Sequence, residues 1–220
     1  MGDFWATVFG YMIFLNTSDI RVWENYQKDI DLTHGFVTPR EFPAKSLEYA
    51  SRFFDEIKGE VIVECGTGLQ GELSGDSMLY WFRKTEAKII HCIDMDIKWI
   101  NTVRDSLGST ERVKYHEDNC FNVVPGIKNI DLIYMDYWVG DGREREKSYL
   151  NLYNKSSFPK LILIDDSDHS RPWKQTMIVP FAMVSHGYRL VYMGRQTLLV
   201  RKDVAEGCEE ILLKLRSLLN

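Results

Sequence analysis

Short apolar runs alternate with segments of helical periodicity over most of this chain. Seven runs stand out, at residues 61–63, 89–93, 113–115, 130–135, 161–164, 188–193 and 197–201. Between them, apolar residues at helical spacing predict helices near residues 77–84, 98–107, 144–152 and 172–184. Continuous apolar strands separated by helices are typical of a parallel sheet with helices on both faces.

The last two apolar runs break that alternation. Only residues 194–196 separate them, and a parallel crossover needs about a dozen residues or more, so these strands should be antiparallel. A helical pattern over residues 204–219 closes the chain. We therefore predict an α/β fold, with a doubly wound, mostly parallel seven-stranded sheet and a reversed C-terminal hairpin strand.

The first part of the chain has a different character. Residues 1–58 look helical and irregular, and aromatic side chains crowd the start at Phe4, Trp5, Phe9, Tyr11 and Phe14. This aromatic stretch is too short to span a bilayer. We predict a helical N-terminal extension at 1–58 and a ligand-binding domain at 59–220. The aromatic stretch would pack as a cover on the domain, or form a lid over a substrate or a homodimer contact.

Charge and cysteine usage exclude some partners. The chain has 27 Lys and Arg against 32 Asp and Glu, a net charge of −5. Nucleic-acid binding usually needs a basic surface, so we expect no nucleic-acid partner. We expect no membrane partner either, because no apolar stretch resembles a spanning segment or a signal peptide. The four cysteines have no CxxC spacing, which favours reduced thiols in a cytoplasmic protein.

Glycines and acids follow the first two apolar runs. Gly66, Gly68 and Gly71 match the pattern G-x-G-x-x-G literally, and Asp94 closes the second run. In dinucleotide-binding folds such glycines let the backbone approach the ligand, and such an acid accepts the ribose hydroxyls. A NAD-dependent oxidoreductase of Rossmann type is therefore one hypothesis.

Other residues in the same loop disfavour a dinucleotide. The acids Glu64 and Glu72 stand where a pyrophosphate would lie, and Asp76-Ser77 is a better helix start than the glycine run. An acid at position 64 suits a ligand with a positive end, such as the amino group or sulfonium of S-adenosylmethionine (SAM).

Taken together, these motifs resemble the class I SAM-dependent methyltransferases. The resemblance rests on Glu64-x-Gly66-x-Gly68, on Asp94, and on Asp118-Asn119 after the third run. It covers about residues 55–202, including the reversed hairpin, although Gln70 stands at the third family glycine. It implies that the glycine loop binds the methionine part of SAM, that Asp94 binds the ribose, and that Asp118 and Asn119 lie beside the adenine. The implied cofactor-binding residues are Glu64, Gly66, Gly68, Asp94, Asp118, Asn119 and Asp136.

Carboxylates also follow the fourth and fifth runs. Asp136 follows one, and Asp165-Asp166 follow the other. Carboxylate oxygens from neighbouring strand ends suit Mg²⁺, although such residues are also common as caps before a helix. The pattern resembles the metal-dependent O-methyltransferases of the catechol and antibiotic-sugar types. That resemblance implies a Mg²⁺ site at Asp136, Asp165 and Asp166, which would orient the substrate oxygens.

The catalytic base is the weakest match to those relatives. They have a Lys or His three residues after the strand-four acid, where this chain has Val139. His169 and Asp141 are the candidate bases, with His34 of the extension as a third. We expect a SAM-dependent methyltransferase acting on a hydroxyl of a small molecule. The alternatives are the NAD-dependent oxidoreductase and a non-catalytic binding protein of the same fold.

Overall fold

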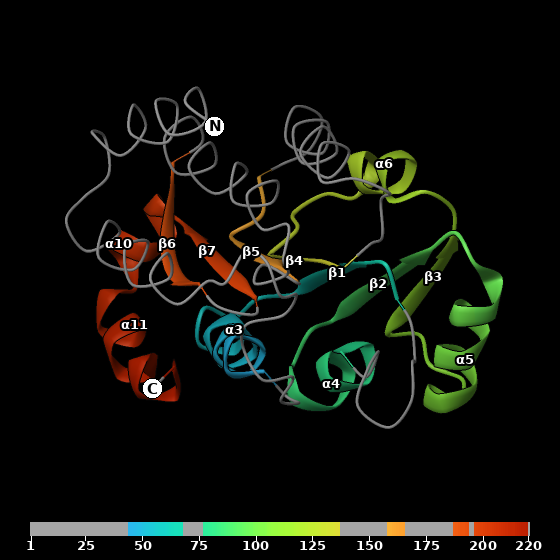
Figure 1. Ribbon diagram of the computed structural model, residues 1–220, viewed down its shortest axis with the longest axis horizontal. Helices are drawn as coiled ribbons and strands as arrows, with labels where there is room; N and C mark the ends of the chain where they lie inside the picture. The colour runs from blue at the N-terminus through green and yellow to red at the C-terminus, as the bar shows by residue number, and fades with distance from the viewer. Residues whose placement is uncertain (1–43, 68–76, 137–157, 166–186, 194–195, 220) are drawn as a thin grey trace, which may run out of the picture.

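A seven-stranded sheet forms the centre of the protein (Figure 1). The computed structural model describes residues 44–67, 77–136, 158–165, 187–193 and 196–219. The strand order is β3-β2-β1-β4-β5-β7-β6, which confirms the predicted fold class. The strands are β1 (Val61–Cys65), β2 (Ile89–Asp94), β3 (Val113–Glu117), β4 (Leu132–Met135), β5 (Leu161–Ile164), β6 (Tyr188–Met193) and β7 (Thr197–Arg201).

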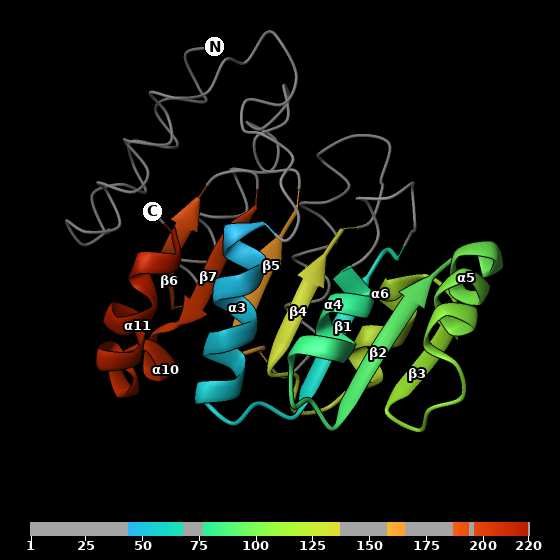
Figure 2. The same ribbon diagram turned by 90° about the horizontal axis from the view of Figure 1, so that it is seen from below.

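Strand direction changes at one place in the sheet. Strands β1 to β5 are parallel, whereas β7 pairs antiparallel with both β5 and β6. Figure 2 shows the arrow of β7 pointing opposite to those of β4 and β6. Only β7 of the predicted hairpin is therefore reversed. The central strands β4 and β5 are buried at every position, as expected for strands covered on both faces.

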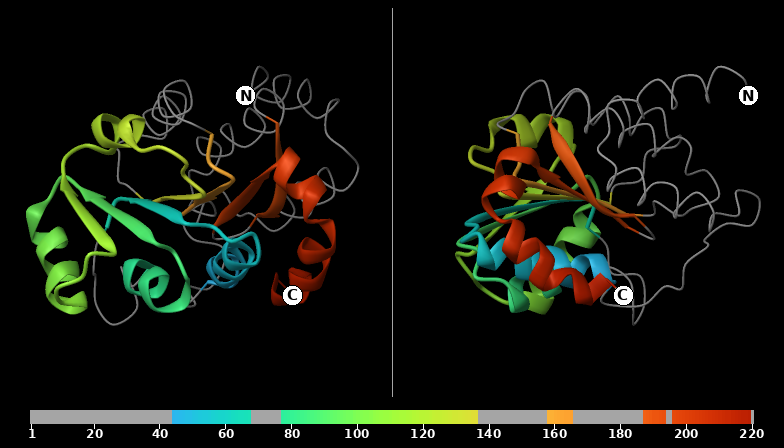
Figure 3. Two further views of the ribbon diagram at one scale, coloured as in Figure 1. Left: turned by 180° about the vertical axis from the view of Figure 1, so that it is seen from behind. Right: turned by 90° about the vertical axis from the view of Figure 1, so that its left-hand side faces the viewer.

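Helices lie on both faces of the sheet. Figures 1 and 3 show α3, α4 and α11 along one face and α6 on the other. The helices are α3 (Lys45–Glu56), α4 (Ser77–Lys84), α5 (Ile97–Leu107), α6 (Cys120–Val123), α10 (Lys202–Gly207) and α11 (Glu209–Leu215), with 3-10 turns η1 (Val124–Gly126) and η2 (Arg216–Leu219). Within the described residues, no helix is both long enough and apolar enough to cross a membrane.

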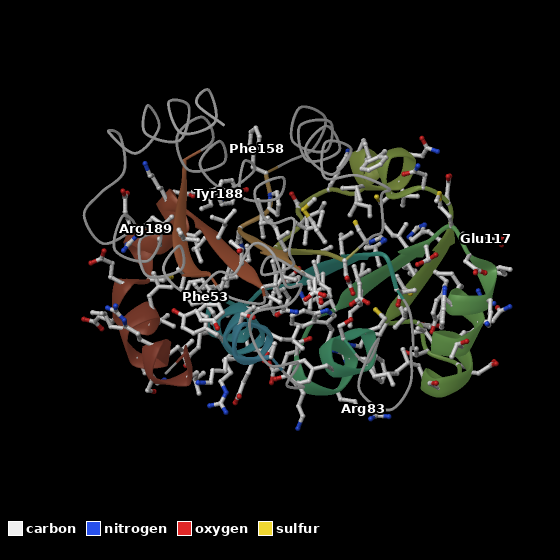
Figure 4. All side chains as sticks on the ribbon, in the orientation of Figure 1. Phe53, Arg83, Glu117, Phe158, Tyr188 and Arg189 are labelled. Atoms are coloured by element: carbon white, nitrogen blue, oxygen red, sulfur yellow. The ribbon has the colours of Figure 1, made fainter. Side chains whose placement is uncertain are left out.

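Helix α3 packs into the main core although it belongs to the predicted extension. Its Leu47, Phe53 and Phe54 are buried in one cluster with Ile62 and Leu163 of the sheet. Figure 4 shows Phe53 between α3 and the sheet. Residues 1–43 lie outside the described residues, so the lid and homodimer predictions stay predictions.

The end of the chain differs from the prediction. The single helix expected over residues 204–219 is wrong, because α10 ends at Gly207 and α11 starts at Glu209. Cys208 between them has φ −133° and ψ 25°, outside helical geometry. Glycine has a low helix propensity, which accounts for the break at this point. The predicted helices at 144–152 and 172–184 lie outside the described residues.

The starts of three strands are joined by one buried carboxylate. Asp131 Oδ2 accepts from the backbone N–H groups of Glu60 at 2.7 Å and Val61 at 3.0 Å. Its Oδ1 lies 2.8 Å from Lys160 Nζ, just before β5. Asp131 therefore joins the starts of β1, β4 and β5. The candidate ligand-binding residues lie at the opposite edge of the sheet, at the carboxyl ends of the strands.

Candidate functional site

The candidate residues gather at the carboxyl ends of the parallel strands, here called the carboxyl edge. Each strand end donates a backbone hydrogen bond to its neighbour: Gly66 to Ile93 at 2.9 Å, Asp118 to Asp94 at 3.0 Å, Asp136 to Cys65 at 2.8 Å and Asp165 to Met135 at 3.0 Å. These bonds run from β3 to β5 without a gap. Gly66, Asp94, Asp118, Asp136 and Asp165 therefore share one edge, where ligands bind in open α/β sheets.

Asp94 is held by backbone amides on both of its oxygens. Oδ2 accepts from Thr67 N at 2.9 Å, and Oδ1 accepts from Asp96 N at 2.8 Å. Burial raises the pKa of Asp94 above its ordinary value, and the amides of Asp96 and Thr67 act in the opposite direction. Each carboxylate oxygen keeps a second lone pair, so the group can accept two further hydroxyl donors. This geometry suits a ribose.

The backbone turn at Gly66 positions the Thr67 amide. Gly66 has φ 82°, in the left-handed region that favours glycine. The chain thus turns at the end of β1 towards β2, which brings Thr67 N to Asp94. Gly68 lies outside the described residues.

Glu64 is a completely buried acid at the end of β1. Its exposed fraction is 0%, and Oε1 accepts a hydrogen bond from Ser77 Oγ at 3.0 Å. Oε2 has no hydrogen-bond partner among the described residues. Burial raises the pKa of Glu64 to about 8, although the Ser77 hydroxyl lowers it. Burial thus favours the neutral acid over the carboxylate.

Asp118 and Asn119 follow β3 and organise the start of α6. Asp118 Oδ1 accepts from Asn119 N at 2.6 Å and from Asn122 Nδ2 at 2.9 Å. The hydrogen bond from Asn122, and to a smaller extent the one from the Asn119 amide, lowers the pKa of the exposed Asp118 below its ordinary value. Asn119 caps α6 by accepting from Phe121 N at 3.0 Å. Both residues follow β3, the strand that pairs with the end of β2 at Asp94, and their place beside an adenine stays a prediction.

Asp165 belongs to a buried polar network centred on Gln196. Gln196 Nε2 donates to Asp165 Oδ1 at 2.7 Å and to the Tyr134 hydroxyl at 2.9 Å. Gln196 Oε1 accepts from Ser46 Oγ of α3 at 2.6 Å. The network joins α3, β4 and the end of β5 to the start of β7, and it fixes the orientation of the Asp165 carboxylate.

The predicted Mg²⁺ ligands are placed in part. Asp136 and Asp165 follow neighbouring paired strands, and Asp165 is 4% exposed with one oxygen bonded to Gln196. Asp166 lies outside the described residues. Among those described, no three carboxylate, imidazole or thiol groups come together as a metal site. The described residues thus include two of the three predicted Mg²⁺ ligands, Asp136 and Asp165.

The candidate bases His169 and Asp141 lie outside the described residues, as do Val139 and His34.

The site also has residues that the sequence did not suggest. Met95, directly after Asp94, is 68% exposed and presents an apolar surface at the carboxyl edge. The sequence feature that could have predicted this exposure is the position of Met95 between Asp94 and Asp96, directly after an apolar run. Gln196 had no local signal, because its partners are far away in the sequence.

Comparisons with known proteins give structural matches alone. No protein-family model and no curated protein sequence matches the chain. A proposed O-methyltransferase from Klebsiella pneumoniae is 16% identical, with a TM-score of 0.55 over 89% of this chain and 94% of that one. A methyltransferase from Geobacter sulfurreducens is 16% identical, with a TM-score of 0.53 over 89% and 94%.

A third structure is a Podospora anserina methyltransferase bound to S-adenosylhomocysteine (SAH). It is 18% identical, with a TM-score of 0.50 over 85% of this chain and 88% of that one. The matched structures span nearly the whole length of the chain, and they are similar to it in fold at low sequence identity. Together with the strand order and the reversed β7, these matches show that the chain has the Rossmann-like α/β fold of the SAM-dependent methyltransferases.

Proposed function

We propose that the protein is a SAM-dependent methyltransferase that methylates a hydroxyl group of a small molecule. The observation that carries this proposal is the arrangement around Asp94. Its carboxylate is fixed by the amides of Thr67 and Asp96 beside the Gly66 turn. That combination provides a ribose acceptor next to a backbone that a ligand can approach closely.

The reaction would be a direct displacement. The substrate oxygen attacks the methyl carbon of SAM, the carbon–sulfur bond breaks, and the sulfonium becomes a neutral thioether. The substrate proton passes to a base, for which His169 and Asp141 are our candidates. The protein residues of the carboxyl edge bind and orient the cofactor, and orientation itself lowers the barrier to such a transfer.

Several features support this class over an NAD-dependent oxidoreductase. A dinucleotide-binding sheet of the Rossmann type continues parallel beyond its fifth strand, whereas here the antiparallel β7 follows β5. A cation would stabilise the ionised form of the buried Glu64 carboxyl, whereas the negative charge of a pyrophosphate would disfavour that form further. The name of the Klebsiella pneumoniae structure supports oxygen as the acceptor atom.

The substrate class and location are also proposals. The net charge of −5 favours a small molecule over a nucleic acid. Four free cysteines, of which Cys65, Cys92 and Cys120 are buried, favour a reducing cytoplasmic location.

We also propose that Mg²⁺ assists the transfer, held by Asp136, Asp165 and Asp166. Bound there, the ion would lower the pKa of the substrate hydroxyl. Calorimetric titration with MgCl₂ tests this part, with Asp165→Asn as the comparison. Saturable binding that Asp165→Asn abolishes supports it, and identical titrations of the two proteins contradict it.

Isothermal titration calorimetry tests the main proposal. The full-length protein is titrated separately with SAM, SAH and NADH. Saturable binding of SAM and SAH, with no heat of binding from NADH, is the expected result. Binding of NADH with none of SAM or SAH would overturn the proposal and favour the oxidoreductase.

A further inference from the structure

Glu64 is buried, and none of the ion pairs among the described residues involves it. Its carboxyl group is 0% exposed, and among the described residues its one hydrogen bond comes from the Ser77 hydroxyl at 3.0 Å. Oε2 has no hydrogen-bond partner within the described ranges. An ionised carboxylate that is removed from water without a paired cation is strongly disfavoured, so this environment favours the neutral acid in the free protein.

The groups around Glu64 shift its pKa in both directions. Asp165, at the end of β5, disfavours a second negative charge and raises the pKa of Glu64, and the Cys92 thiol on β2 also interacts with it. The Thr67 hydroxyl and the Trp81 indole N–H are close enough to lower the pKa of Glu64. Thr67 Oγ1 and Trp81 Nε1 are both buried, and neither has a hydrogen-bond partner in the described part of the structure. Burial outweighs these donors and leaves the pKa at about 8.

Within the described part of the chain, Glu64 and the two side chains that influence its pKa therefore each have a buried polar atom without a hydrogen-bond partner. Glu64 Oε2 is an acceptor, while Thr67 Oγ1 and Trp81 Nε1 are donors. Donors of this kind stabilise a carboxylate more than a carboxylic acid. A small gain in favour of the charged form, such as a nearby positive group, would thus ionise Glu64.

We propose that binding of the cationic methionine end of SAM ionises Glu64, so that each cofactor molecule bound releases one proton from this side chain. The inference rests on the proposed cofactor site. The step balances: the neutral carboxylic acid loses its proton to the buffer, and the carboxylate pairs with the ammonium or sulfonium group. Below the pKa of Glu64, SAM affinity then rises by up to about 10-fold per pH unit, and it levels off above that pKa.

Calorimetry at pH 7 in buffers with different ionisation enthalpies, such as phosphate, HEPES and Tris, measures the released protons directly. The slope of the observed enthalpy against the buffer ionisation enthalpy gives the number of protons per ligand. We expect close to one for SAM with the native protein and close to zero with Glu64→Gln. Glutamine is the matched control, because it keeps the shape of the neutral acid and cannot ionise.

Three ligands separate the possible charge partners. SAM has both cations, SAH has the ammonium group alone, and 5′-methylthioadenosine has neither. Release with SAM and SAH assigns the ammonium group, and release with SAM alone assigns the sulfonium; either outcome supports the inference. Release with 5′-methylthioadenosine, or equal release by native protein and Glu64→Gln, would overturn it.

The outcomes also separate this inference from the proposed function. SAM binding without proton release contradicts the inference and leaves the proposed function intact, whereas no binding of SAM or SAH contradicts the proposed function. A ligand-free measurement then still tests Glu64: the ¹³C carboxyl signal that Glu64→Gln removes should titrate well above the range of ordinary glutamates. A signal that titrates in the ordinary acidic range would overturn the inference without any ligand.

Discussion

The Thr67 amide donates a hydrogen bond to Asp94 Oδ2 at 2.9 Å, which joins the turn after β1 to the end of β2. The bond links the two sequence motifs that the proposed cofactor would contact together. It also orients the Asp94 carboxylate before any ligand binds. The consequences for binding and for stability can be separated by mutation.

Asp94→Asn should weaken SAH binding by about 10- to 100-fold, because hydroxyl groups lose a charged acceptor. Calorimetry with SAH measures the loss. Asp96→Ala is the matched control: Asp96 caps α5 by accepting from Lys98 N at 2.9 Å, so its loss should lower the free energy of unfolding by about 1 kcal/mol. SAH affinity should change little in Asp96→Ala. Equal effects of the two variants on affinity would contradict the assignment of Asp94.

Glu64 should make the protein less stable as the pH rises. Its folded pKa of about 8 lies above the ordinary value of 4.5, so the folded state holds this proton more tightly than the unfolded state. This contribution to the free energy of unfolding is fully present below about pH 4.5 and is lost as the pH rises to 8. A pKa shift of this size corresponds to a loss on the order of a few kcal/mol. Urea unfolding of the native protein and of Glu64→Gln, at several values from roughly pH 5 to 8, measures how the free energy of unfolding of each protein depends on pH. Parallel pH dependences in the two proteins would rule out the buried neutral acid.

The Gln196 network should contribute more to stability than an ordinary hydrogen bond. Gln196→Leu removes the donor to Asp165 and Tyr134 and the acceptor for Ser46, so three buried hydrogen bonds are lost. We expect a loss of about 2–4 kcal/mol in the free energy of unfolding. Ser46→Ala should cost about 1–2 kcal/mol, and the double variant less than the sum of both. Strict additivity would show that the two side chains do not act as a unit.

Gly59 should not tolerate a side chain. A Cβ at this position would lie 2.4 Å from the Phe54 ring, and that ring is completely buried and cannot move aside. Gly59→Ala should therefore destabilise the protein by about 1–3 kcal/mol. Gly207→Ala is the control, because nothing lies within 4 Å of its Cβ position. Thermal unfolding compares the two, and equal melting temperatures would contradict the close packing at Gly59.

Much of the fold could be predicted because its strands are buried on both faces. Residues 161–164 form a continuous apolar run, and they form β5 as Leu161–Ile164. The acids at strand ends were predictable for the same reason, since Asp94 and Asp136 directly follow apolar runs. Their side-by-side placement then follows from parallel pairing.

The remaining features depend on contacts between distant residues. Gln196 and Ser46 are 150 positions apart, and no local pattern marks either one. The protonation of Glu64 depends on complete burial beneath α4 residues such as Ser77, which periodicity does not reveal. The break at Cys208 also went unpredicted, because the apolar pattern continues through it.

A crystal structure of the protein bound to SAH would locate the cofactor relative to Asp94. We expect both ribose hydroxyls within about 3 Å of the Asp94 carboxylate, and the amino-acid end next to the Gly66 turn and Glu64. An SAH molecule bound away from the carboxyl edge, or with its ribose out of contact with Asp94, would contradict this expectation.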